Sequence, residues 1–241
     1  MAKDPLMFDF NKSIVKEGPV WKIDNFYKDP YPIAQMFKTL KPDMFKAAAS
    51  PSWNGKRFND MRHHLKSDQM EPIYEFLGDV CGQPILGNDT EQNKHEIHTN
   101  VFNMQDIPWN DYENYYWWPH HDYGWTAIVY LNEIDDSGTN LYKCLHEHEP
   151  IEKQITEEHY QPWRPKDRYE IVHHCKPKFN TLYLYDGFNY IHGQNIVSNL
   201  FTYQDRINQV FFFDHRSGNT TTGGKEEECY NRDLSWINSQ S

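Results

Sequence analysis

The stretch Trp117-Trp118-Pro119-His120-His121-Asp122 leads into Thr126-Ala127-Ile128-Val129-Tyr130-Leu131, a run of β-branched and apolar residues. A run of this kind predicts a buried strand. Further strands are predicted at 20–23, 95–103, 140–145, 181–185 and 206–213. Strands at this spacing, without a helical pattern between them, indicate an antiparallel sandwich or jelly roll.

The N-terminal third predicts helices that flank this sheet. Apolar residues recur at helical spacing after Asp29-Pro30, and again after Ser67-Asp68, which can cap a helix that ends near Gly82. The polar stretch 43–67 between them is predicted to be loop. The expected fold class is therefore mainly β with flanking helices.

The length of 241 residues suits one domain. We expect 1–93 to supply strand and helix support, 94–216 to form the β core, and 217–241 to be a tail. Inside the core, 146–178 shows little periodicity and predicts an insertion that could cover a site. The four cysteines are scattered, which favours free thiols.

The composition excludes several classes of function. A net charge of −11 argues against general nucleic-acid binding, because neutralising phosphates requires a basic face. The N-terminus has no apolar signal segment and no long apolar run follows, so no membrane association is expected and the prediction is a soluble, cytoplasmic protein. Nothing in the sequence indicates an oligomeric state.

His120 and Asp122 are candidate metal ligands. On a strand, residues two apart point to the same face, so these two side chains can converge on one ion while His121 points away. His192, which follows the strand predicted at 181–185, can supply a third ligand. Two imidazoles and one carboxylate on one face of the metal are the ligand set of non-haem Fe(II) oxygenases.

Other interpretations compete with this one. The chain has thirteen histidines, so an accidental H-x-D pair is common, and further His clusters occur at 95 and 98, 146 and 148, and 173 and 174. Arg206 favours the first triad, because an Arg at the mouth of a barrel can clamp one end of a dicarboxylate whose other end chelates the metal. Tyr130 could reach the same carboxylate or be an ordinary core residue.

The region from His95 to Asp214 resembles the 2-oxoglutarate/Fe(II)-dependent dioxygenase superfamily, most closely its prolyl-hydroxylase-like branch. The resemblance is carried by the H-x-D motif at 120–122, by Tyr130-Leu131-Asn132 with a Gly-containing turn after it, and by His192 and Arg206. The opening, 20–33, is similar to uncharacterised bacterial and phage members. The interval between His192 and Arg206 is longer than is usual in prolyl hydroxylases.

The resemblance implies a double-stranded β-helix (jelly roll, cupin-like) with N-terminal supporting helices. It also implies that His120, Asp122 and His192 bind Fe(II), and that Arg206 and Tyr130 hold the distal carboxylate of the co-substrate 2-oxoglutarate, with dioxygen (O2) as the oxidant. The expected reaction is hydroxylation of an aliphatic C–H bond, with release of succinate and CO2. The expected substrate is a small molecule or a peptide or protein, with a peptidyl or free amino-acid side chain favoured.

Two other classes of function remain open. One is a non-catalytic jelly-roll binding or structural module, in which the His and Asp residues are incidental. The other is a cupin-like metal enzyme that does not use 2-oxoglutarate. The aromatic residues that flank the H-x-D motif can line a substrate entrance or pack the sandwich, and the sequence favours neither; they are Trp109, Tyr115, Tyr116, Trp117, Trp118 and Trp125.

Overall fold

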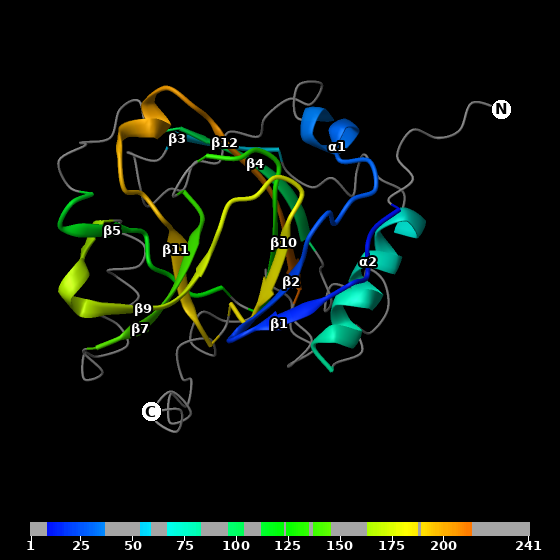
Figure 1. Cartoon of the computed structure of the whole chain (residues 1–241), viewed down its shortest axis with the longest axis horizontal. Coiled ribbons are helices and arrows are strands. Elements are labelled where there is room, and N and C mark those ends of the chain that lie inside the picture. Colours follow the sequence, from blue (N-terminus) through cyan, green and yellow to red (C-terminus); the bar gives the residue numbers. More distant parts are fainter. Residues whose placement is uncertain are drawn as a thin grey trace.

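The computed structural model describes residues 9–36, 54–58, 67–82, 96–103, 112–122, 124–134, 137–145, 163–187 and 189–213. The fold is built on a seven-stranded antiparallel sheet (Figure 1). In sheet order its strands are β1 (Val15–Glu17), β2 (Val20–Ile23), β10 (Leu182–Tyr185), β6 (Trp125–Tyr130), β12 (Arg206–Phe213), β4 (Glu96–Asn103) and β3 (Asn54–Phe58).

A second, three-stranded sheet faces the first. Its order is β11 (Ile191–Gln194), β7 (Thr139–Cys144) and β9 (Tyr169–Cys175), and all of its pairings are antiparallel. A two-stranded sheet of β5 (Tyr115–Trp117) and β8 (Trp163–Pro165) completes the strands. The helical elements are α1 (Tyr31–Met36), α2 (Ser67–Val80) and the 3-10 turns η3 (Lys166–Arg168) and η4 (Asn199–Thr202).

The burial of strand β6 explains why its sequence is a run of mostly apolar residues. All six of its residues are buried, because both faces of the strand are covered. Ala127 and Val129 belong to the outer core, to which α2 contributes side chains such as Leu77. Ile128 and Tyr130 belong to the inner core between the two sheets. Figure 1 shows α2 on the β1 side of the large sheet, away from β7, β9 and β11.

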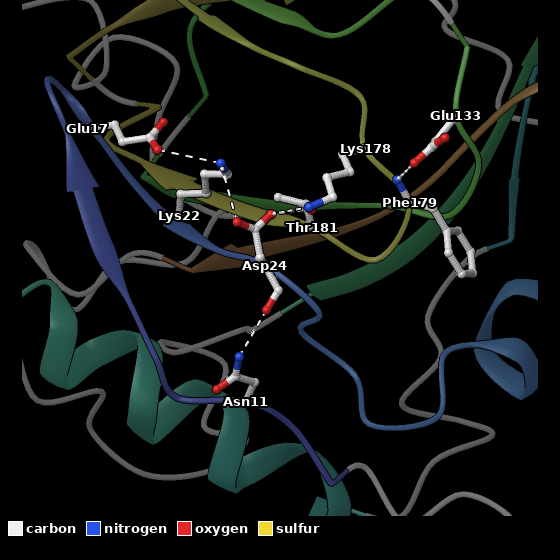
Figure 2. Close-up of polar contacts among 8 residues, drawn as sticks. All are labelled: Asn11, Glu17, Lys22, Asp24, Glu133, Lys178, Phe179 and Thr181. Carbon is white, nitrogen blue, oxygen red and sulfur yellow. Dashed lines mark hydrogen bonds and ion pairs between the residues drawn. The ribbon is translucent and has the colours of Figure 1, made fainter.

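Polar contacts around Asp24 tie the end of β2 to the segment that precedes β10 (Figure 2). The Asp24 carboxylate accepts hydrogen bonds from Lys178 Nζ at 3.2 Å and Thr181 Oγ1 at 3.1 Å, and Lys22 Nζ lies 3.5 Å away. The backbone N–H of Tyr130 donates to the Thr181 carbonyl at 3.2 Å. The same contacts therefore fix the end of β6 at which Tyr130 lies.

Most of the predicted elements are confirmed. The strands at 20–23 and 206–213 have the expected bounds, and the helix predicted after Ser67 is α2. The helix predicted after Asp29-Pro30 is α1, which the structure describes as far as Met36. Cys175 is a free thiol, as expected. No helix in the described part of the chain is long and apolar enough to cross a membrane.

Two predictions of irregular structure were wrong. The stretch 43–67 contains β3, whose Asn-Gly-Lys-Arg-Phe sequence lacks apolar alternation because it is an edge strand. The predicted insertion 146–178 contains β8, η3 and β9, and β9 is an integral strand of the second sheet. A register shift opposite Leu141 and Tyr142 breaks the alternation of β9 and hides it from pattern analysis. Residues 146–162 and the predicted tail 217–241 lie outside the described residues.

Candidate metal centre

The structure brings His120, Asp122 and His192 together. His192 is the second residue of β11, and its backbone forms an isolated antiparallel bridge with His120. The two hydrogen bonds of this bridge measure 2.9 and 2.8 Å between nitrogen and oxygen. The sequence predicted that the H-x-D segment lies on a strand. It is instead held beside β11 by one isolated bridge.

The ligand atoms of the three side chains form a compact group. One nitrogen of each imidazole and one carboxylate oxygen all lie within 4.8 Å of one another. His192 Nε2 is 3.0 Å from Asp122 Oδ2, and His120 Nε2 is 3.7 Å from Asp122 Oδ1. Among the residues that the structure describes, this is the group of metal-binding side chains that converges.

The other histidine clusters do not form such a group where they are described. His174 Nδ1 lies 2.6 Å from the side-chain oxygen of Asn140, and His173 joins no group of three metal-binding side chains. His95, His146 and His148 lie outside the described residues, and the side chain at 98 is likewise not described.

Backbone carbonyls fix the tautomers of both histidines. His120 Nδ1 is 2.7 Å from the Trp118 carbonyl oxygen, and His192 Nδ1 is 3.0 Å from that of Tyr190. A carbonyl oxygen only accepts hydrogen bonds, so each Nδ1 carries a proton and donates it. In the neutral imidazole, Nε2 then has its lone pair free, and in both residues this atom faces Asp122. Two lone pairs beside a carboxylate can take up a cation, either protons on the imidazoles or one shared metal ion.

The Trp118 carbonyl takes this position through an unusual backbone conformation. Trp118 has φ of +46°, in the left-handed region that non-glycine residues rarely adopt. Strain of this kind persists only where the surrounding structure holds it, and it gathers at functional sites. Here it lies two residues before the first candidate ligand and turns the carbonyl toward that ligand's ring.

Asp122 is held by contacts on both sides. Its carboxylate accepts a hydrogen bond from the buried hydroxyl of Thr126, and its backbone N–H donates to the Gly187 carbonyl at 2.8 Å. Burial raises the pKa of this carboxyl, whereas His192 and then His120, when they carry a second proton, lower it, and the balance holds the pKa below its ordinary value. The side chain is therefore an ionised ligand.

Close approach at this centre requires glycine at two positions. A Cβ on Gly187 would lie 2.5 Å from Thr126 Oγ1 and 3.0 Å from Asp122 Cβ. A Cβ on Gly193, which follows His192, would lie 2.7 Å from the Trp117 carbonyl oxygen. Both glycines let the ligand-bearing segments pack against each other without a side chain between them.

Arg206 lies in the inner core, at the first residue of β12. Its side chain is buried, with the residue 6% exposed, and it donates hydrogen bonds to the Ser137 carbonyl at 3.1 Å and to Thr139 Oγ1 at 3.2 Å. Burial lowers its pKa, and within the described residues no carboxylate pairs with it. A buried guanidinium without an anionic partner is costly, so the site is suited to an anion.

Tyr130 lies against this guanidinium. The Arg206 Cζ atom is 5.3 Å from the centre of the Tyr130 ring, and the Tyr130 hydroxyl donates to Thr139 Oγ1 at 2.8 Å. The two residues predicted to hold a carboxylate are therefore neighbours at one end of the inner core. The structure also shows that the Tyr130 proton already has an acceptor.

The sequence patterns did not identify Tyr185 as a candidate site residue. It is the last residue of β10, it is 1% exposed, and its ring centroid lies 4.9 Å from that of His192. The alternation in Leu182-Tyr183-Leu184-Tyr185 places both tyrosines on one face, but it does not show which face meets the candidate ligands. Only the pairing of β10 with β6 shows that.

The aromatic residues around the H-x-D motif mostly pack the fold. Trp117 lies in a buried cluster with its ring centroid 4.9 Å from that of Trp163, and Trp125 belongs to the outer core. Trp118 lies beside the site, with its ring centroid 6.1 Å from that of His120. Trp109 lies outside the described residues. For Trp117 and Trp125, the packing interpretation is therefore the one that the structure supports.

No protein-family model matches the chain, and no curated protein matches it. Among solved structures, the non-heme alpha ketoglutarate dependent epimerase SnoN from nogalamycin biosynthesis is similar with a TM-score of 0.50 and 11% identity, over 81% of this chain and 78% of its own. HygX from Streptomyces hygroscopicus, with nickel and 2-oxoglutarate bound, gives a TM-score of 0.49 at 10% identity over 83% and 84%.

A prolyl-4-hydroxylase from Pseudomonas putida gives a TM-score of 0.40 at 10% identity, over 83% of this chain and 94% of its own. At these identities the likeness concerns the fold. The similarity to SnoN, together with the two facing sheets, confirms the double-stranded β-helix, or jelly roll, that the sequence predicted.

Proposed function

We propose that this chain is an Fe(II)- and 2-oxoglutarate-dependent oxygenase in which His120, Asp122 and His192 hold the metal. The observation that carries the proposal is the orientation of the two imidazoles. Both Nδ1 atoms are engaged by carbonyls, so both Nε2 lone pairs point toward the Asp122 carboxylate. This donor set, with two nitrogens and one oxygen on one side of the ion, suits Fe(II) with open positions for a chelating co-substrate and dioxygen.

The position of Arg206 supports a dicarboxylate as the co-substrate. Thr126, which contacts Asp122, and Tyr130, which contacts Arg206, lie four residues apart on β6. At the usual rise of a strand, this separation is about 13 Å. The metal ligands and the guanidinium thus lie at two different levels of the same strand, as the two ends of a bound diacid such as 2-oxoglutarate would require.

Arg206 would bind the distal carboxylate, with Tyr130 beside it. The guanidinium supplies charge and paired N–H donors for a carboxylate. For Tyr130 to contribute a hydrogen bond as well, its hydroxyl proton must turn from Thr139 Oγ1 toward the ligand. Arg206 is therefore the principal determinant in this proposal, and Tyr130 supports it.

The iron would supply the redox chemistry that couples oxidation of 2-oxoglutarate by dioxygen to oxidation of a second substrate. In the balanced reaction, one oxygen atom enters succinate as CO2 leaves, and the other enters a C–H bond of the substrate as a hydroxyl group. We propose hydroxylation of a peptidyl or free amino-acid-like substrate because the motifs resemble the prolyl-hydroxylase-like branch. The fold itself hosts more than one reaction, so it does not decide this point.

The first experiment is an anaerobic titration. Fe(II) and then 2-oxoglutarate are added to the apo-protein, and the weak visible metal-to-ligand charge-transfer band of the chelate is recorded. We expect the band with the native protein and its loss with Asp122→Ala. Iron binding without the band would favour a cupin-like metal enzyme that does not use 2-oxoglutarate. A folded protein that binds no iron would favour the binding-module alternative.

A further inference from the structure

We propose that the hydroxyl group of Tyr185 donates a hydrogen bond to the co-substrate at its metal-binding end. This inference rests on the proposed function and adds a residue that neither the motif nor the resemblance assigns. Arg206 and Tyr130 account for one end of a dicarboxylate. Tyr185 would account for the chelating end, beside the metal ligands.

The register of the strands places Tyr185 at the level of the metal centre. On β10 it pairs with Thr126 of β6, whose hydroxyl donates to Asp122. Its ring packs edge-on against His192, with an interplanar angle of 61°. Tyr185 therefore contacts one candidate ligand directly and lies across a strand pair from the partner of another.

Tyr185 and Tyr130 belong to the same buried cluster of the inner core between the two sheets. Tyr130 lies against the guanidinium, with the Arg206 Cζ atom 5.3 Å from its ring centre, whereas Tyr185 lies against His192. The two tyrosines therefore mark the two ends of the proposed co-substrate site.

The Tyr185 hydroxyl has no acceptor among the described residues, whereas the other buried phenols nearby are engaged. Tyr130 donates to Thr139, and Tyr183 has a backbone contact at Lys176. A hydroxyl that the protein leaves without an acceptor can donate its proton to a ligand.

Tyr185→Phe tests the inference, because it removes one oxygen atom and keeps the ring against His192. Tyr183→Phe is the matched control: it makes the same change on the same face of β10, two residues from the metal level. The assay is an anaerobic titration of the Fe(II)-loaded protein with 2-oxoglutarate. It yields the dissociation constant and the energy of the charge-transfer band.

We expect Tyr185→Phe to raise the dissociation constant for 2-oxoglutarate about tenfold or more, because a hydrogen bond to a charged group is lost. The band should shift in energy, since the lost contact lies on the chelating end. Iron affinity should be unchanged, and Tyr183→Phe should resemble the native protein. Arg206→Gln should weaken the binding of 2-oxoglutarate without shifting the band, because Arg206 acts on the distal carboxylate and not on the chelating end.

Two results would overturn the inference. If native protein forms the chelate and Tyr185→Phe matches it in affinity and band energy, the hydroxyl makes no contact, although the proposed function stands. If native protein binds iron but forms no chelate with 2-oxoglutarate, the proposed function and this inference fail together.

Discussion

His120 and His192 face each other across a single antiparallel bridge, and each donates its backbone N–H to the other's carbonyl. Their ring centroids lie 4.5 Å apart. The bridge fixes the two candidate ligands from the main chain, independently of the metal. The Nδ1 contacts to Trp118 and Tyr190 then fix the rings. The nitrogen ligands are thus positioned in advance, which lowers the entropic cost of binding an ion.

The first prediction concerns stabilisation by metal. A divalent ion such as Ni(II), present at a hundred times its dissociation constant, should stabilise the fold by about 2.7 kcal/mol. For a chain of this size, the melting temperature should rise by about 5–10 °C. Asp122→Ala should abolish this shift, because the carboxylate ligand is lost. Differential scanning calorimetry without oxygen measures it.

His173→Gln serves as the control for metal held by other histidines. His173 belongs to a competing cluster in the sequence but joins no group of converging ligands. This variant should keep the full shift in melting temperature. An equal loss of the shift in His173→Gln and Asp122→Ala would show that the metal effect does not arise at the proposed centre.

The second prediction concerns Thr126. Its hydroxyl donates to the Asp122 carboxylate and is buried, so it orients this ligand. Thr126→Val keeps the shape of the side chain and removes the donor, and metal affinity should fall about 10- to 100-fold. Thr126→Ser keeps the hydroxyl and should retain affinity within a few fold. Competition with a chelator of known affinity measures both, and equal affinities in the two variants would contradict the role.

The third prediction concerns alkaline pH. Burial raises the pKa values of Tyr27, Tyr130 and Tyr185 above the ordinary value of 10.0. Because the folded pKa values exceed the unfolded ones, the stability from keeping these phenols neutral is complete below pH 10 and is lost as pH rises above it. Phenolate absorbance from the buried set should therefore appear together with the loss of circular dichroism. A complete phenolate signal while the protein is still folded would contradict this.

The triad could be predicted because each of its residues is marked by a short, local stretch of sequence. An H-x-D motif before a buried strand, and a His after a later strand, need only strand order to converge. The tautomers could not be predicted, since they depend on the left-handed backbone at Trp118. The position of Tyr185 depends on the pairing of β10 with β6, which the alternation in the sequence leaves open.

The missed strands have a similar cause. Pattern analysis detects a strand through regular burial of alternate residues. In β9 only Tyr169 and Cys175 are fully buried, because the register shift and the exposed Ile171 and Val172 interrupt the alternation. In β3 the edge position removes the apolar signal altogether. Both strands are specified by long-range pairing with β7 and β4 rather than by their own residues.

The last prediction separates function from stability at Arg206. The residue is a buried cation that donates hydrogen bonds to Ser137 and Thr139 but pairs with no carboxylate of the described residues, so no ion pair there compensates its charge. Arg206→Met removes the charge but keeps most of the apolar length. The free energy of unfolding, measured with urea, should be unchanged or higher, because an unpaired buried charge and its desolvation cost are gone.

The dissociation constant for 2-oxoglutarate should rise at least about 100-fold, since the anion loses its charged partner. Iron affinity should stay at the native value, because the metal ligands lie at the other end of the inner core. A large loss of stability with 2-oxoglutarate binding intact would instead make Arg206 a structural residue.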